Sequence, residues 1–299
     1  MKDILYCCTM VDRSETPDAS PELLSAFGFE LSTWKEEETG EIRHTLYFQE
    51  EREAFVARDL LMAKAEEFAS FGCVFNPIEC TRLKREDWAE SWKLHFKPMV
   101  VSERLAVSPS WEKFQPLPGQ SLLLLDPGMS FGTGQHATTK FCLVSIDRFI
   151  AELKAKGASG ISLLDAGSGS GILAIGGKLL GCTRVDAFDI DPETLPVARE
   201  NARKNGIRDE DLSLAVSSLS DYSPDIRYDI VAANILSSAL IAGKEKLLSF
   251  CQPGTFLILA GILDSEYGRV KDVFESDNCR ELFSAKEKEW RGGAFRIGG

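Results

Sequence analysis

From residue 161 onward, short apolar runs alternate with amphipathic segments, and this alternation constrains the fold more than any other feature of the chain. The apolar runs are ISLLDAG (161–167), RVDAFDID (184–191), SLAVSS (213–218), YDIVAANIL (228–236) and TFLILAGIL (255–263). Continuous apolar strands that alternate with helices are typical of a parallel sheet covered by helices on both faces. We therefore expect an α/β fold with a Rossmann-like, doubly wound and mostly parallel sheet.

Two local features qualify this expectation. The helix after RVDAFDID contains Pro196, which removes a backbone hydrogen bond, so the helix either begins near Thr194 or has a distorted first turn. The final stretch, RELFSAKEKEWRGGAFRIGG, is typical of two strands with Gly292-Gly293 at the turn between them. The sheet is therefore expected to end in a C-terminal antiparallel hairpin.

Residues 1–83 predict a separate small α+β domain. A strand at 4–10 precedes a helix at 20–28, and two alternating segments flank the turn-like Thr39-Gly40. An amphipathic helix over 51–72 and a last strand over 73–83 complete the set. The apolar positions expected on that helix include Phe55, Leu60, Ala63 and Phe68. The order strand-helix-strand-strand-helix-strand predicts a ferredoxin-like layer of helices on an antiparallel sheet.

Residues 84–120 are expected to form a linker helix and an extended arm, which leaves 121–299 for the Rossmann-like domain. Trp88, Trp92 and Phe96 recur four residues apart and so share one helix face. We favour docking of this stripe against a neighbouring domain over stacking on a ligand. The stretch VVSERLAVSPSW that follows is typical of a strand pair or an extended arm.

Composition excludes some classes of function. The net charge of −12 argues against attraction to a nucleic-acid backbone, which needs clustered Lys and Arg. It suits a basic protein substrate, although it also serves plain solubility. The eight cysteines form no CxxC pair and the three histidines lie far apart, so we expect reduced thiols and no metal site. No apolar run is long enough to span a bilayer, and Asp12 and Arg13 come too early for a signal-peptide core. We expect a cytoplasmic protein.

The run DAGSGSG places Gly167, Gly169 and Gly171 between a strand and a helix. Glycine allows the backbone to pass close to a ligand there, because any Cβ would block that approach. The dinucleotide fingerprint GxGxxG fails from Gly167, since Ile172 stands at the last position, but GxGxxA fits from Gly169. The run alone therefore does not separate a dinucleotide from another adenosine ligand.

Polar residues follow the other strands. Asp189 lies about twenty residues beyond the glycines, where an acidic side chain meets ribose hydroxyls. We expect Asp191 to cap the next helix, whereas Asp165 could cap its turn or face the ligand. Asn234 ends the fourth strand at the carboxyl edge of the sheet, where its amide could serve a ligand or simply form a turn.

The stretch DPGMSFGTGQHATT (126–139) is rich in glycine but lacks the GK[ST] ending of a phosphate-binding loop. Its last residues, Thr138 and Thr139, are expected to open the helix TKFCLVSIDRFIAELKA. A hydroxyl at that position can both cap the helix and reach a ligand.

Taken together, DAGSGSG, FDID and NIL resemble the S-adenosylmethionine-dependent methyltransferases of the Rossmann-like class. LDPGMSFGTGQHATT is similar to a segment of the ribosomal protein L11 methyltransferase (PrmA) family, and the likeness continues through ANILSSAL, LAGIL and EKEWRGG. It covers roughly residues 85–299. The chain reads GTGQHATT and GSGSG where the family usually has GTGTHPTT and often GCGSG.

The resemblance implies an S-adenosylmethionine-dependent protein-lysine N-methyltransferase. Its acceptor would be ribosomal protein L11, free or in the large ribosomal subunit, recognised by the N-terminal domain, and we expect a monomer. The residues that would bind the cofactor are Phe131, Thr139, Gly167, Gly169, Gly171, Asp189 and Asn234.

Methyl transfer to an amine needs alignment and a neutral nitrogen rather than a metal or a covalent intermediate. We hypothesise that Asn234 accepts a hydrogen bond from the incoming amine. His136 could accept the proton or could instead stabilise its loop. Two other readings are an NAD-dependent Rossmann oxidoreductase and a non-catalytic S-adenosylmethionine-binding module. Titration with either cofactor and transfer of labelled methyl groups would distinguish the three.

Overall fold

The computed structural model describes residues 4–14, 20–27, 29, 31–35, 39–84, 97–126, 137–276 and 278–298. The chain divides into two units, Met1–His95 and Phe96–Gly299, each described by itself. Two of the predicted site residues, Phe131 and His136, lie outside the described residues, as does the expected aromatic stripe of Trp88, Trp92 and Phe96.

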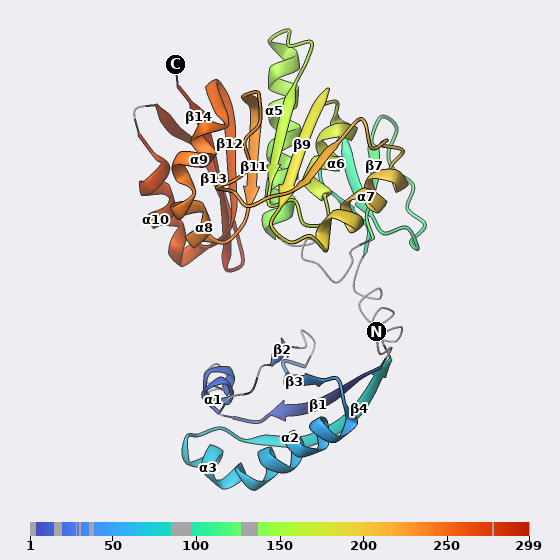
Figure 1. Ribbon diagram of the computed structural model, residues 1–299, viewed down its shortest axis with the longest axis vertical. Helices are drawn as coiled ribbons and strands as arrows, with labels where there is room; N and C mark the ends of the chain where they lie inside the picture. The colour runs from blue at the N-terminus through green and yellow to red at the C-terminus, as the bar shows by residue number, and fades with distance from the viewer. Residues whose placement is uncertain are drawn as a thin grey trace. The chain divides into compact units, whose positions relative to one another are not determined.

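The small unit contains an antiparallel sheet with helices, in the chain order expected from the sequence (Figure 1). Its strands are β1 (Ile4–Asp12), β2 (Ser32–Lys35), β3 (Ile42–Phe48) and β4 (Phe75–Lys84), and its helices are α1 (Ser20–Ala26), α2 (Glu51–Ala63) and α3 (Ala65–Ser70). The sheet order is β2-β3-β1-β4, and each neighbouring pair is antiparallel. Sequential strands β1 and β2 are therefore not neighbours, because β3 lies between them.

The helix expected over 51–72 is interrupted, and its buried face differs from the prediction. The backbone leaves the helical conformation at Lys64, so α2 and α3 are separate helices. Phe68 is buried as expected, but Phe55 and Leu60 are 39% and 42% exposed, and Ala63 is exposed as well. The residues that α2 buries are Ala54, Ala57 and Leu61. Small side chains allow a helix axis to lie close to a sheet, so the hydrophobicity of Phe55 and Leu60 alone misidentified the face.

The sheet of the large unit is mostly parallel, as predicted. Its strands are β8 (Ser162–Ala166), β9 (Arg184–Asp189), β10 (Ser213–Val216), β11 (Tyr228–Asn234), β12 (Cys251–Leu263), β13 (Cys279–Glu287) and β14 (Trp290–Ile297). Their order is β10-β9-β8-β11-β12-β14-β13. The strands from β10 to β12 are parallel to their neighbours, whereas β14 is antiparallel to both β12 and β13.

Helices cover both faces of this sheet (Figure 1). One face carries α5 (Ala137–Ala155), α6 (Ile172–Leu180) and α7 (Thr194–Lys204), and the other carries α8 (Ser237–Ala242), α9 (Lys244–Ser249) and α10 (Asp264–Phe274). On the first face, Phe149 of α5 stacks on Phe256 of β12 with ring centroids 3.9 Å apart. On the second face, Leu240, Leu247 and Val270 share one core with Val231 and Leu257. Apolar residues on both faces of the strands therefore have partners, which explains the continuous apolar runs.

A smaller sheet lies beside α6 and α7. It consists of β5 (Met99–Val100), β6 (Leu105–Ser108) and β7 (Ser121–Leu124) in the order β5-β6-β7. The pair β5-β6 is antiparallel, which confirms the expected strand pair, and β6-β7 is parallel. Helix α7 begins at Thr194, so Pro196 lies in the first turn, where a backbone N–H would have no helical partner.

The expected turn at Gly292-Gly293 is wrong. Strand β13 ends at Glu287 and β14 begins at Trp290, so the turn is at Lys288, whose φ is 54°. Both glycines lie inside β14. A Cβ at Gly292 would lie 2.3 Å from the Phe141 ring, and one at Gly293 would lie 2.1 Å from the Tyr267 hydroxyl. These glycines are needed for close packing against α5 and α10 rather than for a turn.

Within the part of the chain that is described, no helix combines the length and the hydrophobicity needed to cross a membrane.

Candidate functional site

The strand order of the large sheet reverses between β8 and β11. From β8 the chain proceeds to β9 and β10 on one side, and from β11 it proceeds to β12 on the other. Ligands of open α/β sheets bind at such a switch point, beyond the carboxyl ends of the strands. Ala166, near the end of β8, pairs with Phe188 of β9 and with Ala233 of β11. The glycine loop, Asp189 and Asn234 therefore meet at one edge, as the sequence predicted.

The three loop glycines adopt left-handed backbone conformations, with φ of 85° at Gly167, 49° at Gly169 and 79° at Gly171. The loop turns sharply, because the N–H groups of Gly167 and Ser168 both donate to the Phe188 carbonyl, at 2.9 and 3.0 Å. A Cβ at Gly167 would lie 2.3 Å from Cγ2 of Ile235. The requirement for glycine at 167 thus already follows from a protein neighbour, in addition to any ligand.

Asp189 is held by two backbone groups. Its Oδ2 accepts from the Gly169 N–H at 2.8 Å, and its Oδ1 accepts from the Asp191 N–H at 3.0 Å. Each carboxylate oxygen can accept a further hydrogen bond, so the group remains suited to two ribose hydroxyls. Asp191 accepts from the Glu193 N–H at 2.9 Å and so closes a turn two residues along the chain. The N-cap of α7 is Glu193, without a side-chain capping bond, so the expectation that Asp191 caps this helix is wrong.

Asp165 is fully buried at the end of β8. Its Oδ2 accepts from the Ala174 N–H at 3.1 Å, in the first turn of α6, so the structure supports the capping alternative. Its Oδ1 is buried and accepts no hydrogen bond from any described residue. Burial, reinforced by the nearby charge of Asp189, raises the pKa of Asp165 to about 7.

Asn234 contacts Thr139, although the two residues are 95 positions apart. The Asn234 amide Nδ2 donates to the Thr139 hydroxyl at 3.4 Å. Thr139 lies in the first turn of α5 and is only 1% exposed. Among the described residues, none donates to Asn234 Oδ1. A side-chain amide oxygen is a hydrogen-bond acceptor.

Three exposed apolar side chains lie at this edge, and none of them was predicted from the sequence as a site residue. Ile190 directly follows Asp189, Leu236 closely follows Asn234, and Val216 ends β10 opposite Asp189. Ile190 is 73% exposed, Leu236 71% and Val216 49%. Exposed apolar residues beside hydrogen-bonding groups are typical of small-molecule sites. Ile190 and Leu236 could have been found from the sequence, because they follow the polar residues Asp189 and Asn234 at the ends of predicted strands.

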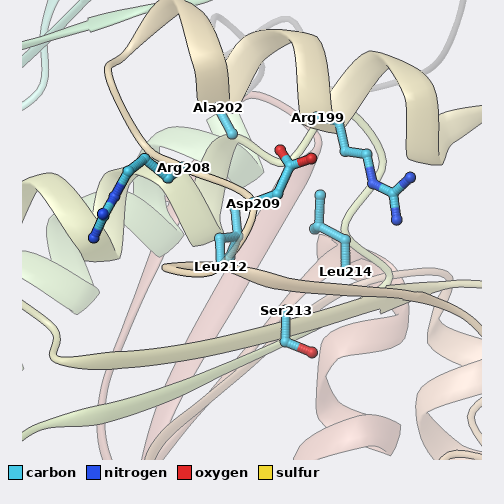
Figure 2. Close-up of a pocket in the computed structure, with 7 residues that line it drawn as sticks. All are labelled: Arg199, Ala202, Arg208, Asp209, Leu212, Ser213 and Leu214. Atoms are coloured by element: carbon cyan, nitrogen blue, oxygen red, sulfur yellow. The ribbon is translucent and has the colours of Figure 1, made fainter.

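A cavity of about 220 Å³ lies elsewhere in the large unit, beside α7 and the start of β10 (Figure 2). Its lining includes Arg199, Arg208, Asp209 and Ser213. Ser213 begins β10, whereas the partner of Asp189 is Val216 at its end, so the cavity lies toward the opposite edge of the sheet. Asp209 is already paired with Arg203 at 2.7 Å. The cavity is therefore separate from the candidate site.

Comparisons with known proteins agree with this geometry. The chain matches the family model of ribosomal protein L11 methyltransferase (PrmA) over residues 18–295. It is 39% identical over 225 residues to a ribosomal protein L11 methyltransferase from Citrifermentans bemidjiense, covering 75% of this chain and 72% of that protein. It is 38% identical over 234 residues to one from Geotalea daltonii, covering 77% and 73%.

The fold of the chain is also similar to that of a solved structure. A crystal structure of a ribosomal protein L11 methylase from Lactobacillus delbrueckii subsp. bulgaricus superimposes with a TM-score of 0.59 at 30% identity. The match covers 68% of this chain and 99% of that chain.

Proposed function

The chain belongs to the ribosomal protein L11 methyltransferase (PrmA) family, and from that premise we propose that it transfers methyl groups from S-adenosylmethionine to amino nitrogens of ribosomal protein L11. The observation that carries this proposal is the meeting of the glycine loop, Asp189 and the Asn234–Thr139 pair at the switch point of the sheet. The acceptor nitrogens include lysine side chains.

The described residues fit the methyl donor. Asp189 has acceptor capacity for the ribose hydroxyls, and the exposed Ile190 and Val216 offer apolar surface for the adenine. The loop that contains Gly167, Gly169 and Gly171 follows β8 at the same edge of the sheet. We assign Thr139 and Asn234 to the methionine end, and we propose Phe131 as a further contact.

For methyl transfer the protein needs mainly to position the two substrates and to remove water from the amine. When bound, S-adenosylmethionine supplies a methyl group already activated by a positive sulfonium. Orientation of two reactants can contribute about 7–11 kcal/mol to lowering a barrier. The attacking amine must be neutral, and a lysine in water has a pKa of about 10.4, so an apolar and water-poor site favours the reactive form.

Asn234 is proposed to orient the amine. Its Nδ2 is engaged by Thr139, so its Oδ1 is directed to accept from an N–H of the acceptor. A neutral amide oxygen accepts this bond without binding the charged ammonium as strongly as a carboxylate would. We retain His136 as a proposed proton acceptor, with stabilisation of its own loop as the alternative.

The N-terminal part is proposed to recognise the acceptor. Residues 1–83 contain 17 acidic and eight basic side chains, so they carry most of the negative charge of the chain. Such a domain attracts a basic protein over long range. We classify its sheet and helices as ferredoxin-like, and we divide the chain functionally into 1–83 for recognition, 84–120 as a linker and 121–299 for catalysis.

We further propose that the enzyme acts as a monomer in the cytoplasm, on free L11 or on the large ribosomal subunit. Its negative charge gives no basis for direct recognition of ribosomal RNA.

The decisive experiment is transfer of labelled methyl groups. The purified chain is incubated with labelled S-adenosylmethionine and with unmethylated L11 or ribosomes that contain it, and we expect label in L11. Tight donor binding with no label in any protein would instead indicate a non-catalytic module. Binding of NAD in place of S-adenosylmethionine would indicate an oxidoreductase.

A further inference from the structure

We propose that Asn201 is a positioning residue that ties the donor-binding glycine loop to the backbone of Asp126, two residues after the end of β7, an inference that rests on the proposed function. Asn201 lies on α7 and is 1% exposed. Its Nδ2 donates to the Ser170 carbonyl at 3.0 Å, and its Oδ1 accepts from the Asp126 N–H at 3.3 Å. One buried amide thus connects two parts of the chain that are otherwise distant in sequence.

Asp126, one of the two partners of the Asn201 amide, is itself held in place by several hydrogen bonds. Its carboxylate accepts from the Ser110 N–H at 2.8 Å, from the Ser110 hydroxyl at 2.6 Å and from Lys204 at 2.7 Å. Burial tends to raise the pKa of Asp126, but the bonds from Lys204 and Ser110 outweigh it and hold the pKa below its usual value. The carboxylate stays charged, and the backbone of Asp126 is fixed where it meets Asn201.

The glycine loop requires such a restraint. Ser170 stands between Gly169 and Gly171, and glycine leaves the backbone many alternative conformations. From the strand side, Asp189 holds the Gly169 N–H. From the helix side, Asn201 holds the Ser170 carbonyl. These two contacts add to the bonds from the Gly167 and Ser168 N–H groups to the Phe188 carbonyl, and they restrain the loop before the donor arrives, which reduces the entropy lost on binding.

The two hydrogen bonds of the Asn201 side chain require an amide. Asn201 must donate on one side and accept on the other, which neither a carboxylate nor an apolar side chain of similar size can do. Asn205, one helical turn later, provides a natural comparison. Its amide accepts from the Leu124 N–H at 2.8 Å and donates to the Leu124 carbonyl at 2.7 Å and to the Asn201 carbonyl at 2.8 Å. Asn205 therefore ties strand β7 to the backbone of α7, whereas the side chain of Asn201 reaches the glycine loop.

The test is the variant Asn201→Asp, with Asn205→Asp as the matched control. Asn201→Asp keeps an acceptor for the Asp126 N–H but removes the donor to Ser170. At neutral pH we expect its Kd for S-adenosylmethionine, measured by calorimetry well below the melting temperature, to rise at least tenfold. The affinity should recover as the pH falls, because a protonated carboxyl can donate again. In Asn205→Asp the Kd should stay within twofold of the wild type.

Steady-state kinetics supply a second readout. With L11 as acceptor, Asn201→Asp should raise the KM for S-adenosylmethionine while kcat at saturation changes less than threefold, because the loop is restored once the donor is bound. If Asn201→Asp does not fold, Asn201→Ser is measured in the same way, since its hydroxyl is too short to span both partners.

An unchanged Kd in the Asn201 variant would overturn the inference and leave the proposed function intact. An equal rise in both variants would also overturn it, because the effect would then belong to helix α7 in general. A wild-type protein that does not bind S-adenosylmethionine would overturn the inference and the proposed function together.

Discussion

At the scale of single residues, the site depends on which atom of each side chain is already engaged. Asn234 uses its Nδ2 for the Thr139 hydroxyl, and Asp189 uses both carboxylate oxygens for backbone N–H groups. These contacts restrain the side chains before any ligand binds, so we expect the remaining acceptor positions to be pre-oriented. Pre-orientation is the main contribution a protein can make to a reaction whose methyl donor is already activated.

Removal of the Asn234 amide tests this orientation. We expect Asn234→Ala to lower kcat for methyl transfer to L11 by about 100-fold, the size typical of a lost hydrogen bond to a reacting group. The measurement is incorporation of labelled methyl at saturating donor and acceptor. Asn205→Ala removes an amide of the same kind away from the switch point and should retain most of the activity. Transfer by Asn234→Ala at the wild-type rate would refute the proposed role.

Asp165 gives the protein a predicted pH dependence of stability. Its folded-state pKa of about 7 lies above the usual value near 3.9, so the folded state holds an extra proton between these two pH values. The contribution of Asp165 to the free energy of unfolding is therefore fully present below pH ~4 and is lost as pH rises through about 7. The loss is on the order of 4 kcal/mol.

Denaturant titrations from pH 4 to 8 measure this effect. Subtracting the values for Asp165→Asn from those of the wild type cancels the titration of other groups. We expect the difference to fall across this window. An identical pH slope in the two proteins would show that Asp165 is already ionised at low pH.

At the scale of secondary-structure elements, glycines are required for different reasons in different places. In the loop after β8, Gly167 meets Ile235 at the end of β11, whereas Gly292 and Gly293 in β14 meet side chains of α5 and α10. The sequence predicted a turn at Gly292-Gly293 because a Gly-Gly pair favours one. Only the packing of neighbouring helices reveals that these glycines provide space instead.

Gly167→Ala and Gly157→Ala form a matched pair. Both glycines have φ near +85°, but a Cβ at Gly157 has no atom within 4 Å. Gly157→Ala should cost about 1–2 kcal/mol from backbone strain alone. Gly167→Ala should cost about 1–3 kcal/mol more from the clash with Ile235 and should weaken binding of S-adenosylmethionine.

Denaturation of both variants and donor titration provide the measurements. Ile235→Ala in combination with Gly167→Ala should recover part of the lost stability, because Cγ2 is removed. Equal costs for the two single variants would show that Ile235 moves aside freely.

At the scale of the whole molecule, charge is distributed unevenly. The first 83 residues have 17 acidic and eight basic side chains, while the remaining 216 residues are close to balanced, with 29 acidic and 26 basic. Long-range attraction of a basic partner therefore arises mainly from the N-terminal part. Such attraction affects the rate of encounter more than the chemical step.

Salt should affect the reaction with L11 and the binding of S-adenosylmethionine to different extents. We expect kcat/KM for L11 to fall several-fold between about 0.05 and 0.5 M salt, because the Debye length shortens over this range, whereas the Kd for S-adenosylmethionine should change far less. Neutralising residues 36–38, a run of three glutamates, should weaken the salt dependence. Neutralising residues 209–211, which also carry three acidic side chains, is the control in the large unit. A salt-independent kcat/KM would contradict electrostatic recognition.

The sequence by itself determined the class of fold and the places where polar residues follow strands. Apolar periodicity shows whether one or both faces of an element are buried, so the parallel sheet could be predicted. Pro196 indicated either a start of α7 near Thr194 or a distorted first turn, and the structure has the start at Thr194. The glycine loop, Asp189 and Asn234 were placed at one edge for the same reason, since parallel strands end together.

Only the tertiary structure decided which side chains touch. The contact between Asn234 and Thr139 joins residues 95 positions apart, and Asn201 joins Ser170 to Asp126. The buried face of α2 was also decided by packing, because Ala54 and Ala57 are buried while the larger Phe55 is 39% exposed. Local patterns carry no information on such contacts, which depend on how distant elements fit against one another.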